Sequence, residues 1–130
     1  MTDGIKIVVL NTAYVDNRLY QIRLLKDSWD GKHAKAFSPK LIDKTKKLIG
    51  DLIEEPEIFP TADGTIQLEY SGQNGTYLEI NIGLGEMCEV YIVDNVGNEK
   101  TFLIKTETDA LNCIISKIQN KRYTNGDRQA

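Results

Sequence analysis

Hydrophobic and polar residues alternate along residues 58–104, and this alternation predicts a sheet of consecutive antiparallel strands. The clearest strands are residues 65–70 and 76–82, in which every second side chain is apolar. A Ser-Gly-Gln-Asn-Gly segment joins the two, and because Asn-Gly readily adopts positive φ, it predicts a hairpin. Further strands are expected at residues 86–93 and 100–105, so the sequence predicts a β-meander.

The segment before this region contains two elements of different character. Residues 5–10 are continuously apolar and rich in β-branched side chains, which fits either a buried strand or the start of a helix, and we favour the strand. A helix is then expected from Asp16, as its N-cap, to about Ser28. Its apolar stripe continues to Trp29, which we expect to fold onto the sheet as a structural residue.

Two further helices are expected to pack on the apolar face of the sheet. Ser38-Pro39 is a typical N-cap and first-turn pair, and residues 41–52 after it carry one apolar stripe. Residues 58–60 can form only a short edge strand because proline cannot donate to a ladder. The last helix is expected at residues 108–120. The sequence therefore predicts an α+β fold, an antiparallel β-meander with helices packed on one face, in the order (β)ααββββα.

The length of 130 residues fits one domain with one core, which we expect at residues 1–120, followed by a flexible polar tail at residues 121–130. No leader pattern is present, and no apolar run approaches the roughly 20 residues of a membrane span. Cys88 and Cys113 have no CxxC spacing, and both are expected to be reduced and buried. We therefore expect a cytoplasmic protein without membrane contact.

Charge is unevenly distributed, although the net formal charge is only −3. Residues 18–47 contain nine basic and three acidic residues, whereas the predicted sheet is acidic. Lys40, Lys44 and Lys47 share one face of a predicted helix, which fits either phosphate contacts or an ordinary solvated face. Because no nucleic-acid reader motif accompanies them, a nucleic-acid-binding accessory protein is the alternative function rather than the first.

Two short motifs flank the predicted helix that begins at Ser38. The first is Trp29-Asp30-Gly31, and the second is residues 60–70, Pro-Thr-Ala-Asp-Gly-Thr-Ile-Gln-Leu-Glu-Tyr. Residues 18–83 thereby resemble a group of small uncharacterised bacterial proteins with a W-D-G segment, a helix and a P-T-x-D-G-x-I-x-L-E-aromatic hairpin, in which tryptophan is common where Tyr70 stands. The group has no established activity, so the resemblance implies no ligand or catalytic residue, and it suggests partner binding only by association.

Neither motif predicts catalysis. Asp30 either caps the turn at Gly31 or stands exposed beside His33, and the W-D-G segment is open to a structural or a functional reading. His33 is the only histidine, and no cysteine or second histidine stands at ligand spacing. No serine has a G-x-S-x-G setting, and Gly83-x-Gly85 falls between strands rather than before a helix. We expect no enzymatic activity, catalytic residue, cofactor or metal.

Tyrosines stand among acidic residues on the predicted outer face of the sheet, and tyrosine is enriched at interface anchors. We therefore predict a protein–protein interaction module, such as an inhibitor, antitoxin or immunity-like component of a small bacterial system. Its partner-binding residues would be Tyr77, Glu79, Glu89 and Tyr91. The alternative surface comprises Asp30, His33, Lys40, Lys44 and Lys47. Exposed edge strands at residues 58–60 or 100–105 leave a homodimer open.

Overall fold

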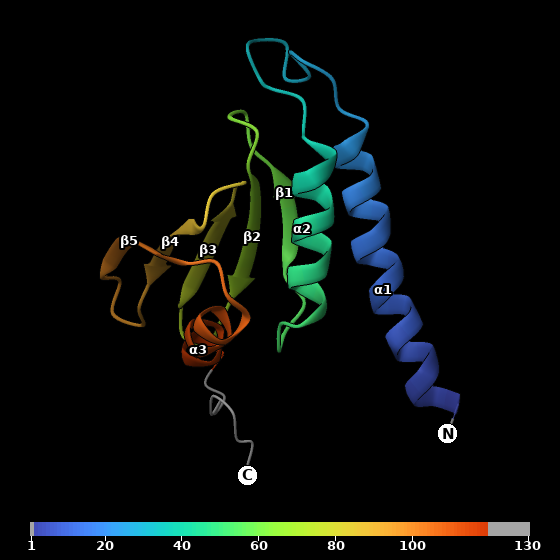
Figure 1. Ribbon diagram of the computed structural model, residues 1–130. Coiled ribbons are helices and arrows are strands. Elements are labelled where there is room, and N and C mark those ends of the chain that lie inside the picture. Colours follow the sequence, from blue (N-terminus) through green and yellow to red (C-terminus); the bar gives the residue numbers. More distant parts are fainter. Residues whose placement is uncertain (1, 120–130) are drawn as a thin grey trace.

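The computed structural model describes the backbone of residues 2–119 and the side chains of residues 13–119 (Figure 1). Within that part of the chain, the elements in order are α1 (Thr2–Arg23), α2 (Pro39–Gly50), β1 (Glu57–Pro60), β2 (Ile66–Ser71), β3 (Tyr77–Ile82), β4 (Met87–Val93), β5 (Glu99–Lys105) and α3 (Thr108–Ile118). The α+β class is confirmed. The predicted tail at residues 121–130 lies outside the described residues.

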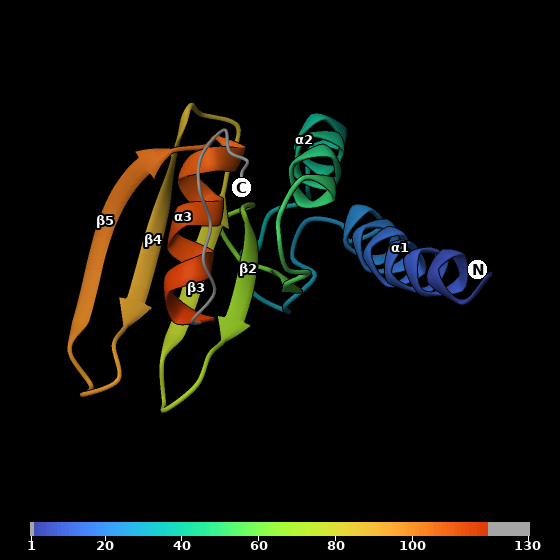
Figure 2. The same ribbon diagram turned by 90° about the horizontal axis from the view of Figure 1, so that it is seen from below.

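The five strands form one antiparallel meander, with the spatial order β1-β2-β3-β4-β5. Helices α2 and α3 pack on one face of this sheet, which we call the inner face, and α1 packs against α2 and the edge strand β1 (Figures 1 and 2). The opposite face, which we call the outer face, is covered by no helix among the described residues. Within the described residues, the outward side chains of the strands are therefore exposed or half-buried rather than packed under a helix.

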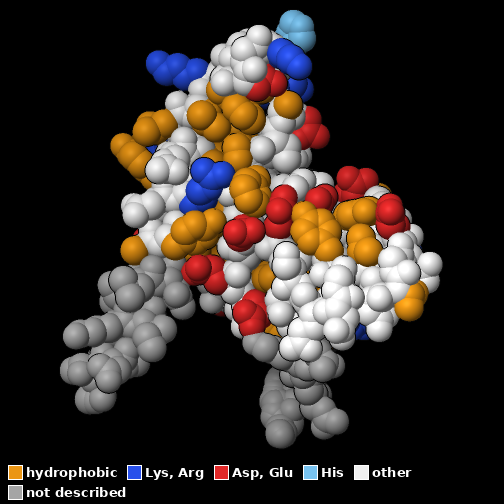
Figure 3. Space-filling view, turned by 180° about the vertical axis from the view of Figure 1, so that it is seen from behind, with side chains coloured by type: hydrophobic (Ala, Val, Ile, Leu, Met, Phe, Trp, Pro, Cys, Tyr) orange, Lys and Arg blue, Asp and Glu red, His pale blue; other side chains and the backbone are white. Residues whose placement is uncertain are grey.

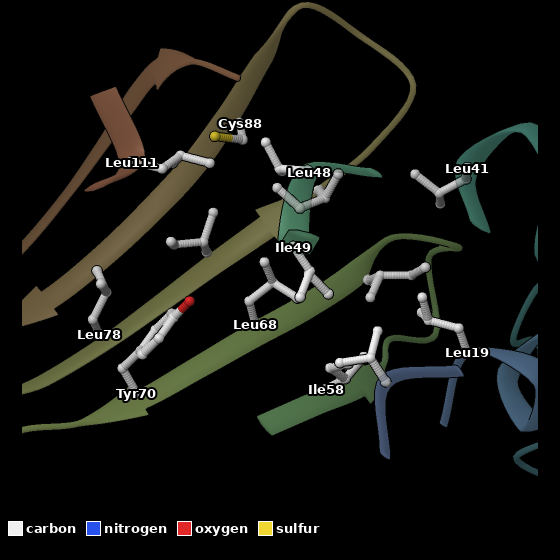
Figure 4. Close-up of a cluster of buried hydrophobic side chains, with 14 of the residues drawn as sticks. Leu19, Leu41, Leu48, Ile49, Ile58, Leu68, Tyr70, Leu78, Cys88 and Leu111 are labelled. Carbon is white, nitrogen blue, oxygen red and sulfur yellow. The ribbon is translucent and has the colours of Figure 1, made fainter. Parts of the chain in front are cut away.

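The core lies between the inner face and the helices, and the alternation of the strands builds it (Figure 4). One rung of inward residues crosses the whole sheet, because register partners in adjacent strands point to the same face. Its members are Ile58, Leu68, Ile80, Val90 and Phe102. The first four are fully buried, and Phe102 on β5 is only half-buried. The core therefore thins toward β5.

Polar side chains cap the start of α2 and tie α3 to the segment after α2. Ser38 is the N-cap of α2, as predicted, and its hydroxyl accepts a hydrogen bond from the Lys40 amide at 3.1 Å. Asn112 on α3 is buried, accepts from the Ile53 amide at 2.9 Å and donates to the Asp51 carbonyl at 3.1 Å. One buried amide thus ties α3 to the segment that leaves α2.

The expected strand at residues 5–10 is wrong, because these residues belong to α1. Asp16 is therefore not an N-cap but an interior residue of α1, where its carboxylate pairs with Lys46 of α2 at 3.1 Å. A strand needs a neighbour for its backbone groups, whereas a helix satisfies its own. The free side of β1 is already occupied by side chains of α1, so no place for another strand exists there.

The expected placement of Trp29 is also corrected. Helix α1 ends at Arg23, and Trp29 lies half-buried in the loop before α2 rather than on a helical stripe. Its ring packs beside Phe37, with the centroids 6.1 Å apart, and its Nε1 donates to the Lys35 carbonyl at 2.9 Å. The indole thus closes a loop instead of continuing a helix.

Candidate partner-binding surface

The outer face of the sheet carries the four residues that the sequence predicts as a partner-binding surface. Tyr77 and Glu79 lie on β3, and Glu89 and Tyr91 lie on β4. Glu79 and Tyr91 are register partners, so the four side chains lie on one continuous surface of two central strands. The structure therefore places all four on one face, as the strand alternation indicates, with Tyr77 and Tyr91 toward one end and Glu89 toward the other.

Tyr77 and Tyr91 form an aromatic pair at one end of this surface. Their ring centroids are 6.3 Å apart, the rings are inclined by 67°, and both side chains are half-buried. The Tyr77 hydroxyl donates to Glu79 Oε2 at 2.8 Å. The hydrogen bond orients the Tyr77 ring, and the edge-to-face contact orients the Tyr91 ring against it.

Three glutamates lie side by side next to this pair. Glu57, Glu69 and Glu79 are consecutive register partners on β1, β2 and β3. Among the residues with described side chains, Lys and Arg form no ion pair with these carboxylates. Directly opposed like charges destabilise a sheet, so this row costs folding free energy. Figure 3 shows the resulting mixture of acidic and hydrophobic side chains on this side of the molecule.

The carboxylates change the chemistry of the tyrosines. Burial, the hydrogen bond to Glu79 and the charges of Glu69 and Glu79 raise the pKa of Tyr77 well above its ordinary value of 10.0. Desolvation and the neighbouring carboxylates Glu99 and Glu79 likewise raise the pKa of Tyr91. Both phenols therefore stay neutral and can donate hydrogen bonds at any physiological pH.

A shallow hollow of about 660 Å³ lies at the other end of the outer face. Its walls come from the turn at residues 61–65 and from side chains of the central strands, including Asn81 and Glu89. Met87 and Leu103 line it as well, and they are 48% and 63% exposed. Exposed apolar side chains that line a hollow can contact a protruding side chain of a partner.

One acidic and two apolar residues of this face were missed from the sequence. The strand alternation already predicts Glu69 at an outward position beside Glu79, whereas Glu57 joins them only because β1 pairs with β2. Met87 and Leu103 occupy outward positions of β4 and β5, where their apolarity breaks the alternation. Both residues could have been identified from the sequence as apolar residues at positions where the alternation predicts polar ones.

The alternative surface is divided in the structure. Lys40 and Lys44 line a hollow of about 520 Å³, and Lys44 and Lys47 line a neighbouring one of about 380 Å³. Asp30 and His33 are exposed in the separate loop that precedes α2. The structure thus aligns the three lysines along α2, as predicted, and gives no contact that joins them to Asp30 or His33.

Several basic side chains of the helices already have partners within the fold. Lys44 Nζ donates to the carbonyls of Gly83 and Gly85 at 2.6 Å and 2.8 Å. Arg18 Nε donates to the Ile58 carbonyl at 2.7 Å, and its guanidinium lies 5.5 Å from the centre of the Phe59 ring. These contacts leave fewer free cations for phosphate groups than the sequence count suggests.

The loop that contains the W-D-G segment is hydrogen-bonded to the turn of the second motif. Asp30 Oδ1 accepts from the amides of Lys32 and Ala34, at 2.9 Å and 3.1 Å, so the capping alternative for Asp30 is confirmed. The Lys35 amide donates to the Ala62 carbonyl at 3.0 Å, which joins the loop to the turn before β2. The polar groups of both motifs thus stabilise backbone conformation.

The described residues contain no cluster of three or more His, Cys, Asp or Glu side chains that could hold a metal ion. Cys88 and Cys113 are free thiols; Cys88 is buried as expected, whereas Cys113 is only half-buried. Burial raises the pKa of the Cys88 thiol, which opposes formation of a nucleophilic thiolate. None of the helices in the described part of the chain has the length and apolarity to cross a membrane.

Comparison with protein-family models, with curated proteins and with solved structures gave no match to this chain. The candidate surface is therefore defined by its own geometry: an aromatic pair, a row of three glutamates and a hollow lined in part by Met87 and Leu103.

Proposed function

We propose that this protein is a protein–protein interaction module that binds a basic partner through the outer face of its sheet. The observation that carries the proposal is the row of Glu57, Glu69 and Glu79 beside the Tyr77–Tyr91 pair, on a face that no described helix covers. The row costs stability in the free protein, and a partner that places Lys or Arg side chains over it would offset this repulsion.

The tyrosines and the hollow add the apolar part of such an interface. Interface cores are enriched in Tyr, Met and Arg, and the strongest contacts cluster where rigid aromatic residues are desolvated. A small inhibitor, antitoxin or immunity-like protein that covers a basic site on its target would use a face of this kind. The two free thiols fit a reducing compartment such as the cytoplasm, and the proposal assigns no catalytic step to the chain.

The proposal is tested by partner capture with matched variants. The immobilised full chain is incubated with extract of the native host after nuclease treatment, and retained proteins are eluted with rising salt. We expect the parent chain to retain one protein. Tyr91→Ser and Glu79→Lys should each bind this protein at least about tenfold more weakly than the parent does. Lys47→Glu, an exposed change on α2, is the control and should bind as the parent does.

Denaturant titrations must first show that each variant has a free energy of unfolding within about 0.5 kcal/mol of the parent's, the usual range for surface changes. Equal binding by the parent, Tyr91→Ser and Glu79→Lys would overturn the proposal. Loss of binding in Lys47→Glu alone, or binding that disappears with the nucleic acid, would favour the lysine face of α2 instead.

A further inference from the structure

The two edge strands of the sheet, β1 and β5, differ in the partners of their outer backbone groups. At β1, the Ile58 amide donates to Tyr14 Oη at 3.2 Å, and the Ile58 carbonyl accepts from Arg18 Nε at 2.7 Å. Side chains of α1 therefore occupy the free side of β1. Strand β5 is the other edge, and no described segment pairs with its far side (Figure 2). An unpaired edge of seven residues without proline is a ready template for another strand.

The register shows which backbone groups of β5 are unpaired. The Thr106 amide donates to the Glu86 carbonyl, and the Asp94 amide donates to the Asn98 carbonyl, so these pairs bracket the β4–β5 ladder. Hydrogen-bonded pairs alternate along an antiparallel ladder, which makes the even-numbered residues of β5 the ones bonded to β4. The odd-numbered residues therefore direct their N–H and C=O groups to the open side.

We propose that the occupant of this edge is the β5 strand of a second copy of this chain, paired antiparallel about a twofold axis at Phe102. This register places Thr101 opposite Leu103 of the second copy, and Leu103 opposite Thr101. The open backbone groups of both residues then form reciprocal hydrogen bonds. The two sheets become one continuous sheet across the dimer, and the contact is the same on both sides, as twofold symmetry requires.

Charge selects this register over its neighbours. With the axis at Phe102, Glu99 stands opposite Lys105 of the second copy, and symmetry repeats the pair at the other end. With the axis at Thr101, Glu99 meets Leu103, and with the axis at Leu103, Lys105 meets Thr101. Both charged side chains are exposed. Lys105 pairs with Glu107 of its own chain at 3.7 Å, but an exposed pair of this kind is weak, so Lys105 can exchange it for Glu99 of the second copy. Only the register at Phe102 joins opposite charges, which stabilise directly opposed cross-strand positions.

Apolar side chains near the axis would also become more buried in the dimer. Helix α3 lies over the middle of the sheet, and β5 extends beyond it (Figure 2). Phe102 and Ile104 are consequently only half-buried on the inner face, and Leu103 is 63% exposed on the outer face. In the dimer, Phe102 packs on its own symmetry mate at a non-hydrogen-bonded position, where side chains approach most closely. The dimer thus covers the part of the core that one chain leaves thin.

The oligomeric state of the full chain in solution tests the inference. Sedimentation velocity of the parent over a range of concentrations should show a dimer that dissociates on dilution. Thr101→Pro removes an N–H group that faces the open side and spares the β4 ladder, so it should yield a folded monomer. A parent that stays monomeric at its highest soluble concentration overturns the proposal.

Charge exchange tests the register without relying on the proline variant. Glu99→Lys and Lys105→Glu should each weaken dimerisation about tenfold, because each places like charges opposite one another twice per interface. The double variant Glu99→Lys with Lys105→Glu should restore the parental affinity. Lys117→Glu, an exposed change on α3, is the matched control and should have no effect. A dimer that ignores both single changes is built from another surface, which also overturns the proposal.

Discussion

At the scale of single residues, Trp29 is the side chain on which the loop before α2 depends. Its ring lies beside Phe37, and its Nε1 donates to the Lys35 carbonyl. Asp27 supports the same loop, since its Oδ1 accepts from the Ala36 amide at 3.0 Å. Phe37 is buried in the core, and these interactions hold the rest of the loop between Phe37 and the turn at Ala62.

We expect Trp29→Ala to destabilise the protein by about 2 kcal/mol, less than a fully buried tryptophan would cost, because the indole is half-exposed. Trp29→Phe keeps the ring contact with Phe37 and loses only the hydrogen bond, so it should cost about 1 kcal/mol. Chemical denaturation of the three proteins measures both values. Parental stability of Trp29→Ala would show that the W-D-G segment is free for a functional role.

Sequence reasoning succeeded where periodicity determines a side chain's direction and failed where a loop does. The alternation of β3 and β4 placed Tyr77 and Tyr91 on the outer face, and register then made them neighbours. Trp29 follows the end of α1, where no period applies, so extending the helical stripe gave the wrong position. The two alternatives for Asp30 could not be separated, because the amides that it accepts from are brought to it only by the folded loop.

At the scale of elements, strands with a clear alternation were predicted within one residue of their ends, as in β2 and β3. Residues 5–10 were misassigned because a short apolar run has no period that separates strand from helix. The contacts that decide the matter are tertiary. Tyr14 and Arg18 lie on one side of α1 and reach the backbone of Ile58 in β1. No local sequence pattern predicts that contact.

Arg18 is therefore expected to hold α1 on the sheet rather than to bind phosphate. Arg18→Met keeps an apolar stem of similar length but removes the donor to the Ile58 carbonyl and the charge over the Phe59 ring. We expect a loss of about 1–2 kcal/mol in the free energy of unfolding and faster amide exchange in β1. Arg23→Met, an exposed change in the last turn of α1, is the control. Equal stability of the two variants would contradict this role.

At the scale of the whole molecule, the fold class, the meander and most of the core follow from the sequence, since they depend on hydrophobic pattern alone. The candidate surface follows only in part. Its hollow arises where the turn at residues 61–65 meets side chains of other strands, and such long-range proximity has no local signature. The open edge at β5 becomes meaningful only when the closed edge at β1 is known.

Alkaline stability reports on two tyrosines in different layers. Tyr70 is buried, and its hydroxyl donates to the Glu54 carbonyl at 2.9 Å. Burial raises the pKa of Tyr70 most, and the charges of Glu54 and Glu55 raise it further. On the outer face, burial and Glu79 raise the pKa of Tyr77. In the unfolded chain both phenols titrate near their ordinary value of 10.0.

Above about pH 10 the unfolded chain therefore binds fewer protons than the folded one, and the free energy of unfolding must fall as the pH rises. Below that pH the two states are equally protonated at these sites, and their contribution is fully present. We expect Tyr70→Phe to cost about 1 kcal/mol at neutral pH, through its lost hydrogen bond, and to decline less steeply than the parent in alkali. Tyr77→Phe should likewise flatten the decline, and Tyr20→Phe, an exposed change on α1, controls for removal of a tyrosine as such. Denaturant titrations at a series of alkaline pH values measure how steeply the free energy of unfolding falls with pH. If Tyr70→Phe declines as steeply as the parent, the Tyr70 phenol ionises as readily in the folded protein as in the unfolded chain.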